Sequence, residues 1–326
     1  MRFLLRRLVF YVIALWAAIT LNFLLPRLMP GSPLDGLIAN YGEQIRSNPQ
    51  ILQQLKASLG SADEPIWQAY PHYLHDIATG DFGHSFAKQV PVGVIIGNTL
   101  PWSIFLVGVG FLLSFIVGTT LGMLAAWRRG GITDNVATPV LMTLQSFPAF
   151  FLSLVAVYFL GLKLGWFPIQ HAYSNDADIG FNAGFAADAM RHAQLPVLVI
   201  IAISAGGWLL GMRNVMITTI GEDYVAFAHA KGLSDRRVMT QYAARNAILP
   251  PLTGFASFFA SAVGGLILVE VVFSYPGVGL TLQQAALGHD YAVVQALLLV
   301  LAICVLVANF IMDCLYVVLD PRVRSA

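Results

Sequence analysis

Six long apolar runs without any Asp, Glu, Lys or Arg constrain this sequence more than any other feature. They cover residues 8–25, 100–127, 135–162, 193–212, 246–269 and 291–312. Most of them match the ~20 residues that a helix needs to cross the hydrocarbon core of a bilayer. Because lipid offers no hydrogen-bond partners to the backbone, these runs must be helices. The sequence therefore predicts an all-α polytopic membrane protein with six transmembrane helices.

Composition agrees with this prediction, since 57% of the residues are hydrophobic and only 11% are charged. An ordinary soluble protein carries about 25% charged residues. The first apolar run is longer than the hydrophobic part of a signal peptide, and no cleavage site of small residues follows it. We therefore interpret it as a retained span. The net charge of +1 gives no sign of nucleic-acid binding.

The distribution of Lys and Arg predicts the orientation, because cytoplasmic segments of membrane proteins are enriched in these residues. With the N-terminus inside, 12 of the 18 Lys and Arg residues fall in inside segments. The other six are Arg27, Arg46, Lys56, Lys88, Lys163 and Arg191. Both termini are then cytoplasmic, and so is the connection between the fourth and fifth spans.

The connections suggest four regions. These are an N-terminal tail with the first span (1–29), an extracytoplasmic lobe (30–98), a five-helix core (99–319) whose cytoplasmic loop covers 213–247, and a cytoplasmic tail (320–326). Within the lobe, apolar residues at 51, 52, 55 and 59 recur at helical spacing, and Trp67, Tyr70 and Tyr73 follow about three residues apart. His72, His75 and Asp76 lie close together there, but no further ligand follows at a suitable spacing, so we expect no metal site. Residues 163–192 lack helical periodicity, and we expect a loop.

Two features of the core could line a passage. Pro139 and Pro148 interrupt the third span, and the bend that a proline causes either serves helix packing or lies beside a passage. In the fifth span, small residues share one helix face, which suits either close helix packing or a passage wall. The candidate pathway residues are Gln145, Ser146, Pro148, Ser257, Ser261 and Gly264.

The segment 224–252, "YVAFAHAKGLSDRRVMTQYAARNAILPPL", is basic and rich in small residues. Gly232 can end a first short helix, and Ser234 or Asp235 can begin a second. Such a compact helical knob can dock into a cleft of another protein or lie on lipid headgroups. The candidate docking residues are Asp223, Ala226, Ala228, Ala230, Lys231, Gly232, Leu233, Ser234, Arg236 and Arg237.

This segment resembles the cytoplasmic coupling loop of ATP-binding-cassette importer permeases. It departs from the common Glu-Ala-Ala-x3-Gly pattern, with Ala226 and Phe227 at the first two positions, and is similar to the loop of the peptide-permease branch. Four further segments resemble that branch: "LMPGSP", "GDFGHSF", "EVVFSYPGVG" and "DCLYVVLDPR". The basic start and large first external loop are similar to the first of its two permease subunits.

The resemblance implies a type I importer permease in a bacterial or archaeal cytoplasmic membrane. Its partners would be a second homologous permease subunit, two ATPase subunits that bind ATP and Mg²⁺, an external substrate-binding protein and membrane lipid. The chain itself would need no cofactor and would not be an enzyme, and it contains no phosphate-binding loop motif. Cargo would be di- or oligopeptides, with oligosaccharides and nickel chelates as alternatives within the branch.

Two other functions remain to be weighed. An ion-coupled carrier usually needs ionisable groups near the middle of the membrane, whereas Glu270 and Asp313 lie near the ends of their predicted spans. A membrane scaffold that only recruits ATPases is the second alternative. Co-purification with a second permease and two ATPases would separate both from an importer subunit.

Overall fold

The computed structural model describes residues 2–28, 65–85, 87–180, 182–255 and 267–319. These residues form helices joined by turns, together with one isolated bridge between His84 and Pro91. They fall into two compact units, Met1–Ser103 with Pro276–Ala326, and Ile104–Tyr275.

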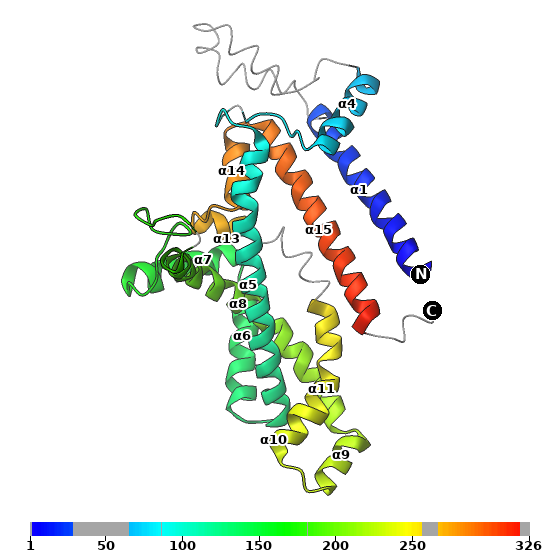
Figure 1. Ribbon diagram of the computed structural model, residues 1–326. Helices are drawn as coiled ribbons and strands as arrows, with labels where there is room; N and C mark the ends of the chain where they lie inside the picture. Colours follow the sequence, from blue (N-terminus) through cyan, green and yellow to red (C-terminus); the bar gives the residue numbers. More distant parts are fainter. Residues whose placement is uncertain (1, 29–64, 86, 181, 256–266, 320–326) are drawn as a thin grey trace. The chain divides into compact units, whose positions relative to one another are not determined.

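The first unit contains α1 (Arg2–Leu28), α4 (Ile66–Thr79), the start of α5 (Val92–Trp127), α14 (Val278–Leu287) and α15 (Tyr291–Leu319) (Figure 1). The second contains the rest of α5, η1 (Thr133–Ala137), α6 (Thr138–Gln145), α7 (Ala149–Ala156), η2 (Val157–Lys163), α8 (Ala183–Ile220), α9 (Asp223–Ala230), α10 (Asp235–Arg237), η3 (Val238–Ala243), α11 (Ala244–Ala247) and α13 (Ile267–Val272).

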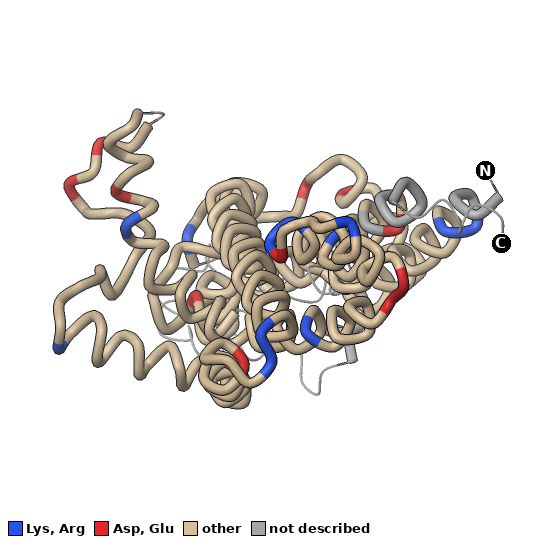
Figure 2. The backbone as a smooth tube through the Cα atoms, turned by 90° about the horizontal axis from the view of Figure 1, so that it is seen from below, with Lys and Arg blue, Asp and Glu red and all other residues tan. Residues whose placement is uncertain are grey.

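Four helices of the described residues are long and apolar enough to cross a membrane: Arg6–Leu24 within α1, α5, α8, and Tyr291–Ile311 within α15. The pair Thr133–Gln145 and Ala149–Lys163 makes a fifth if it is one broken span. Residues 256–266 of the predicted fifth span lie outside the described residues. In Figure 2, the charged residues lie mostly at helix ends and in connections, as apolar spans require.

The helices α1 and α15 lie side by side (Figure 1), and polar side chains join them near both ends. At one end, Tyr11 donates a hydrogen bond to Asp313 (2.6 Å), and Arg7 forms an ion pair with the same carboxylate (3.0 Å). At the other end, the amides of Asn22 and Gln295 each donate to the partner's backbone carbonyl, at 2.9 and 3.1 Å. These bonds set the register of two otherwise apolar helices, because a slip would leave polar groups unpaired in lipid.

The aromatic segment of the predicted lobe forms α4, and the apolar residues at helical spacing over 51–59 lie outside the described residues. Tyr70 and Tyr73 pack on Phe23 of α1, and their hydroxyls bond with Thr20 and Asn22. The rest of the lobe up to residue 64 lies outside the described residues. Within the His72, His75 and Asp76 group, for which we expected no metal site, Nδ1 of His75 lies 3.7 Å from Oδ1 of Asp76. The described residues contain no group of three metal-ligating side chains.

A buried carboxylate connects the loop before α5 to the start of α15. Asp290 is only 3% exposed. It accepts hydrogen bonds from the hydroxyl of Ser85 (2.5 Å) and from the backbone N–H of Ala87 (3.1 Å), and its second oxygen faces the N–H of Val293 at 3.4 Å. The Asp290 carboxylate therefore caps α15 and also binds the loop before α5 to the start of that helix.

We expect Asp290→Ala to lower the thermal stability of the chain and to expose residues 82–91 to protease. The substitution leaves the buried Ser85 hydroxyl without its acceptor, which costs about 1–3 kcal/mol, and removes the acceptor of the Ala87 N–H in an exposed residue. The matched control is Asp81→Ala, whose carboxylate is exposed and accepts one hydrogen bond from Gly83. Equal protease resistance of both variants would contradict the role of Asp290.

Glycines bring α8 into backbone contact with α5 and α6. A Cβ atom at Gly118 would lie 2.5 Å from the carbonyl oxygen of Ala205, and one at Gly122 would lie 2.3 Å from that of Leu209. On the other side, a Cβ at Gly206 would lie 2.8 Å from the carbonyl oxygen of Leu141 in α6. Only glycine fits at these three positions, so they place the helices of the second unit at short interaxial distances.

We expect Gly118→Ala to lower the melting temperature of the detergent-purified chain, because the obstructing atom belongs to the backbone and cannot rotate away. Overpacking of this kind costs about 1–3 kcal/mol. Gly108→Ala, in the same helix, meets nothing within 4 Å and is the control. The close approach is refuted if both variants melt at the wild-type temperature.

The structure differs from the sequence-based expectation around the third and fourth spans. The third span is bent by 110° between Gln145 and Ala149, far more than a proline kink, because Pro148 adopts an extended conformation (ψ 138°) and begins a new helix. The loop predicted over 163–192 was wrong from Ala183 onward, where α8 already begins. Asn182 caps this helix by accepting a bond from Phe185 N–H (2.7 Å).

Candidate docking and coupling site

Residues 223–247, which comprise α9, α10, η3 and α11, fold as a helical hairpin with its turn at Gly232. The sequence predicted two short helices with a bend at this point. Gly232 has φ +74°, which glycine adopts readily. The N–H of Gly232 bonds to His229 O (2.9 Å) and that of Leu233 to Ala228 O (3.4 Å). This pair of bonds is a Schellman motif, and it ends α9. The second helix begins after Ser234, whose side chain makes no capping bond.

A buried cluster fixes the hairpin to the long helices of its unit. Its members come from α5, α8 and all parts of the hairpin: Ala126, Met212, Met216, Val225, Ala228, Val238, Ala243 and Ala247. Trp127 at the end of α5 also stacks on His229, with ring centroids 5.9 Å apart. The hairpin is therefore a packed extension of α5 and α8.

The cluster corrects one part of the sequence-based docking set. Ala228 is 1% exposed and lies in the cluster, and Leu233 packs partly against it. Ala228 therefore cannot offer its side chain to a partner. The other predicted docking residues are exposed: Asp223, Ala226, Ala230, Lys231, Gly232, Ser234, Arg236 and Arg237.

The exposed face of α9 also carries an aromatic side chain that the sequence reasoning did not select. Phe227 is 61% exposed, and Nζ of Lys231 lies 4.5 Å from the centre of its ring. Its spacing from the buried Val225 and Ala228 would have placed it on the outer face of the helix. Among the described residues, no carboxylate is within ion-pair distance of Arg236 or Arg237. We name Phe227, Lys231, Arg236 and Arg237 the docking face.

Three of the predicted pathway residues meet at the 110° bend of the third span. The side chain of Gln145 lies over Gly206, where a Cβ would approach its Oε1 to 2.6 Å. The hydroxyl of Ser146 bonds to Met142 O (3.0 Å), and Pro148 begins α7. All three are exposed. Ser257, Ser261 and Gly264 lie outside the described residues.

Comparison with known proteins supports the assignment that the sequence suggested. Residues 118–325 match the model of a family described as binding-protein-dependent transport system inner membrane component. The chain belongs to this family of transport permeases. Its helical fold and apolar helices agree with the type I permease fold.

Full-length relatives of this permease family have names that refer to peptide transport. A putative peptide permease protein of Brucella ovis is 32% identical over 325 residues, covering 99% of both chains. The di/tripeptide transport system permease protein DppB of Pseudomonas aeruginosa is 32% identical over 335 residues, covering 99% of this chain and 98% of that protein. The dipeptide transport system permease protein DppB of Escherichia coli K12 is 31% identical over 340 residues, covering 99% of each.

We expect Gly232→Val to destabilise the hairpin and Gly232→Asn to preserve it. A Cβ at Gly232 meets nothing within 4 Å, so the effect comes from the positive φ, which costs an ordinary residue about 1–2 kcal/mol and is tolerated by asparagine. Gly211→Val in α8, with equal free space and no positive φ, is the control. Melting temperatures of the purified variants test this, and equal values for Val and Asn at position 232 would contradict it.

Proposed function

We propose that this chain is one of two permease subunits in an ATP-driven importer of di- or oligopeptides. The observation that carries this proposal is the likeness to peptide and dipeptide permeases over 99% of the chain. Its partners would be a second permease subunit, two cytoplasmic ATPase subunits and an external substrate-binding protein. Family membership supports an inner-membrane transport role, and the proposal adds the cargo and the subunits.

The docking face would be the contact with an ATPase subunit. Exposed aromatic residues and arginines supply much of the binding energy at protein interfaces. Phe227 would enter an apolar cleft of the ATPase, and Arg236 and Arg237 would face acidic residues around it. This assignment requires the hairpin to be cytoplasmic, as the distribution of Lys and Arg predicts.

Transport would follow from coupling two states of the permease pair to the state of the ATPases. ATP binding draws the ATPases together, and the hairpin passes this movement to α5 and α8 through the buried cluster. The bend at Gln145, Ser146 and Pro148 would form part of the passage wall. The chain would contribute no catalytic group, and the partner ATPases would hydrolyse ATP.

In proteoliposomes that contain the assembled importer, we expect Phe227→Ala to reduce dipeptide uptake and substrate-stimulated ATPase activity together. Loss of an aromatic anchor costs about 2 kcal/mol, or about 30-fold in the affinity of the ATPase for the permease. Ile132→Ala is the control, because Ile132 is also highly exposed but lies outside the hairpin.

Two results would count against the proposal. Unchanged ATPase affinity in Phe227→Ala would remove the docking role of α9. Failure of the wild-type assembly to take up any dipeptide, while it takes up an oligosaccharide or a nickel chelate, would replace the peptide cargo with another.

A further inference from the structure

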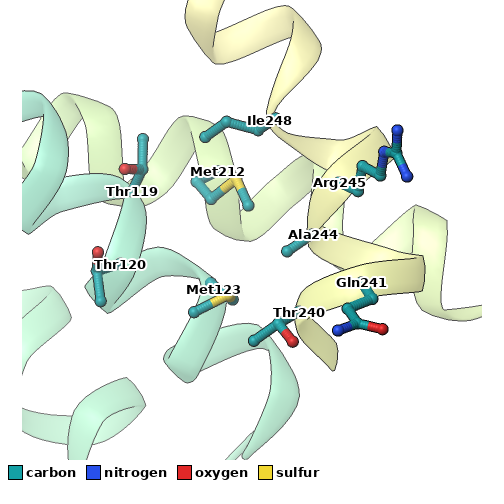
Figure 3. Close-up of a pocket in the computed structure, with 9 residues that line it drawn as sticks. All are labelled: Thr119, Thr120, Met123, Met212, Thr240, Gln241, Ala244, Arg245 and Ile248. Atoms are coloured by element: carbon teal, nitrogen blue, oxygen red, sulfur yellow. The ribbon is translucent and has the colours of Figure 1, made fainter. Parts of the chain in front are cut away.

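A groove of about 590 Å³ lies within the second unit, between α5 and the second half of the hairpin. Its walls are formed by Thr119, Thr120 and Met123 of α5, by Met212 of α8, and by Thr240, Gln241, Ala244, Arg245 and Ile248 (Figure 3). This volume is in the range of small-molecule sites, about 300–1,000 Å³. Neither the family description nor the names of the relatives assign a ligand to it.

Two of the three threonines in the groove wall present few polar groups to its interior. The hydroxyl of Thr119 donates to Phe115 O (2.6 Å), and that of Thr240 donates to Arg236 O (2.8 Å). Their donors are satisfied within their own helices, which leaves methyl groups and weak acceptors for the groove. Met123, Met212 and Ile248 supply the remaining contact surface. Such a lining suits a flexible apolar chain, since methionine adapts to irregular shapes.

The rim of the groove is cationic. Arg245 is exposed at the edge (Figure 3), and within the described chain no carboxylate lies within ion-pair distance of it. The carbonyl oxygen of Gln241 accepts a bond from Nε of Arg237 (3.0 Å), so the amide N–H groups of Gln241 are its free donors. Donors and positive charge at the rim, above an apolar interior, match an anionic headgroup attached to an acyl chain.

We propose that the groove binds an anionic phospholipid of the cytoplasmic leaflet, with its phosphate at Arg245 and one acyl chain between Met123, Met212 and Ile248. Three of the lining residues belong to α5, a helix long and apolar enough to span a membrane, so that an acyl chain could reach the groove from the bilayer. Basic pockets between transmembrane helices on the cytoplasmic side bind anionic lipids in this way. The inference needs the predicted orientation but not the peptide cargo.

This lipid would lie next to the hairpin, and Gln241 at the rim is hydrogen-bonded to Arg237 of the docking face. Thr240, Gln241 and Ala244 form one wall of the groove, and they belong to η3 and α11, the part of the hairpin that follows α10. A bound acyl chain would fill the space between this part of the hairpin and α5. It would therefore stabilise the hairpin in the position that the structure shows.

The test uses the full chain, purified with the subunits that remain bound to it and titrated with phosphatidylglycerol, phosphatidylcholine or inorganic phosphate. Native mass spectrometry counts the retained lipids, and a parallel melting curve reports stability. We expect phosphatidylglycerol alone to bind and to raise the melting temperature. Arg245→Gln should weaken its binding about fivefold, since one basic side chain near the headgroup contributes about that factor. Ala244→Phe should block the acyl chain without changing charge.

Arg128→Gln is the matched control, because it removes an exposed arginine outside the groove, and it should bind phosphatidylglycerol like the wild type. Equal binding of phosphatidylcholine would overturn the proposal in favour of a non-selective apolar seam. Stabilisation by inorganic phosphate alone would overturn it in favour of a site for small anions. No retained lipid in the wild type would show that the groove is closed or filled by protein.

Discussion

The close approach of backbones at Gly118, Gly122 and Gly206 is the constraint on which the second unit depends. Side chains usually keep helix axes 8–10 Å apart, and within a bilayer the hydrophobic effect adds no attraction between helices. Without a Cβ at these positions, α8 contacts α5 and α6 through backbone atoms, and many weak dispersion contacts add up along the interface. The hairpin, the 110° bend and the groove are all built on α8 or its two neighbours, so their geometry follows from these contacts.

In the first unit, polar side chains hold α1 and α15 together, whereas glycines bring the helices of the second unit into contact. Asp313 receives bonds from Tyr11 and Arg7, and the amides of Asn22 and Gln295 bond across the pair. Such groups are costly in lipid unless they are paired, which is why they specify one register of α1 against α15. In the second unit, in the connection after α13, burial raises the pKa of the Tyr275 phenol and the nearby Glu270 carboxylate raises it further, so this phenol stays neutral.

The sequence predicted the features that depend on local chemistry. Uncharged runs predicted the long helices. Gly232 predicted the end of α9, because glycine adopts positive φ without steric cost. Prediction from the sequence failed where the outcome depends on three-dimensional packing. Pro148 predicted a bend in the third span but not its size. The polar, alanine-rich start of α8, which Asn182 caps, was not recognised as helical from the sequence. Ala228 looked like part of a docking surface because small residues serve both burial and contact. Phe227 and the groove were missed because exposure is a property of the folded chain.

The Schellman turn at Gly232 has a mechanical consequence. Since Leu233 N–H bonds back to Ala228, and Ala228 itself lies among Met212, Met216 and Val238, the turn cannot extend without breaking a buried cluster. In the proposed coupling role, the hairpin would then act as a stiff element. A displacement of α9 by a few ångströms would be carried to α8 and to the residues that lead into the fifth span as rotation, with little loss to local bending. Disrupting that turn would also loosen the buried cluster, so that a movement of α9 would no longer reach α8.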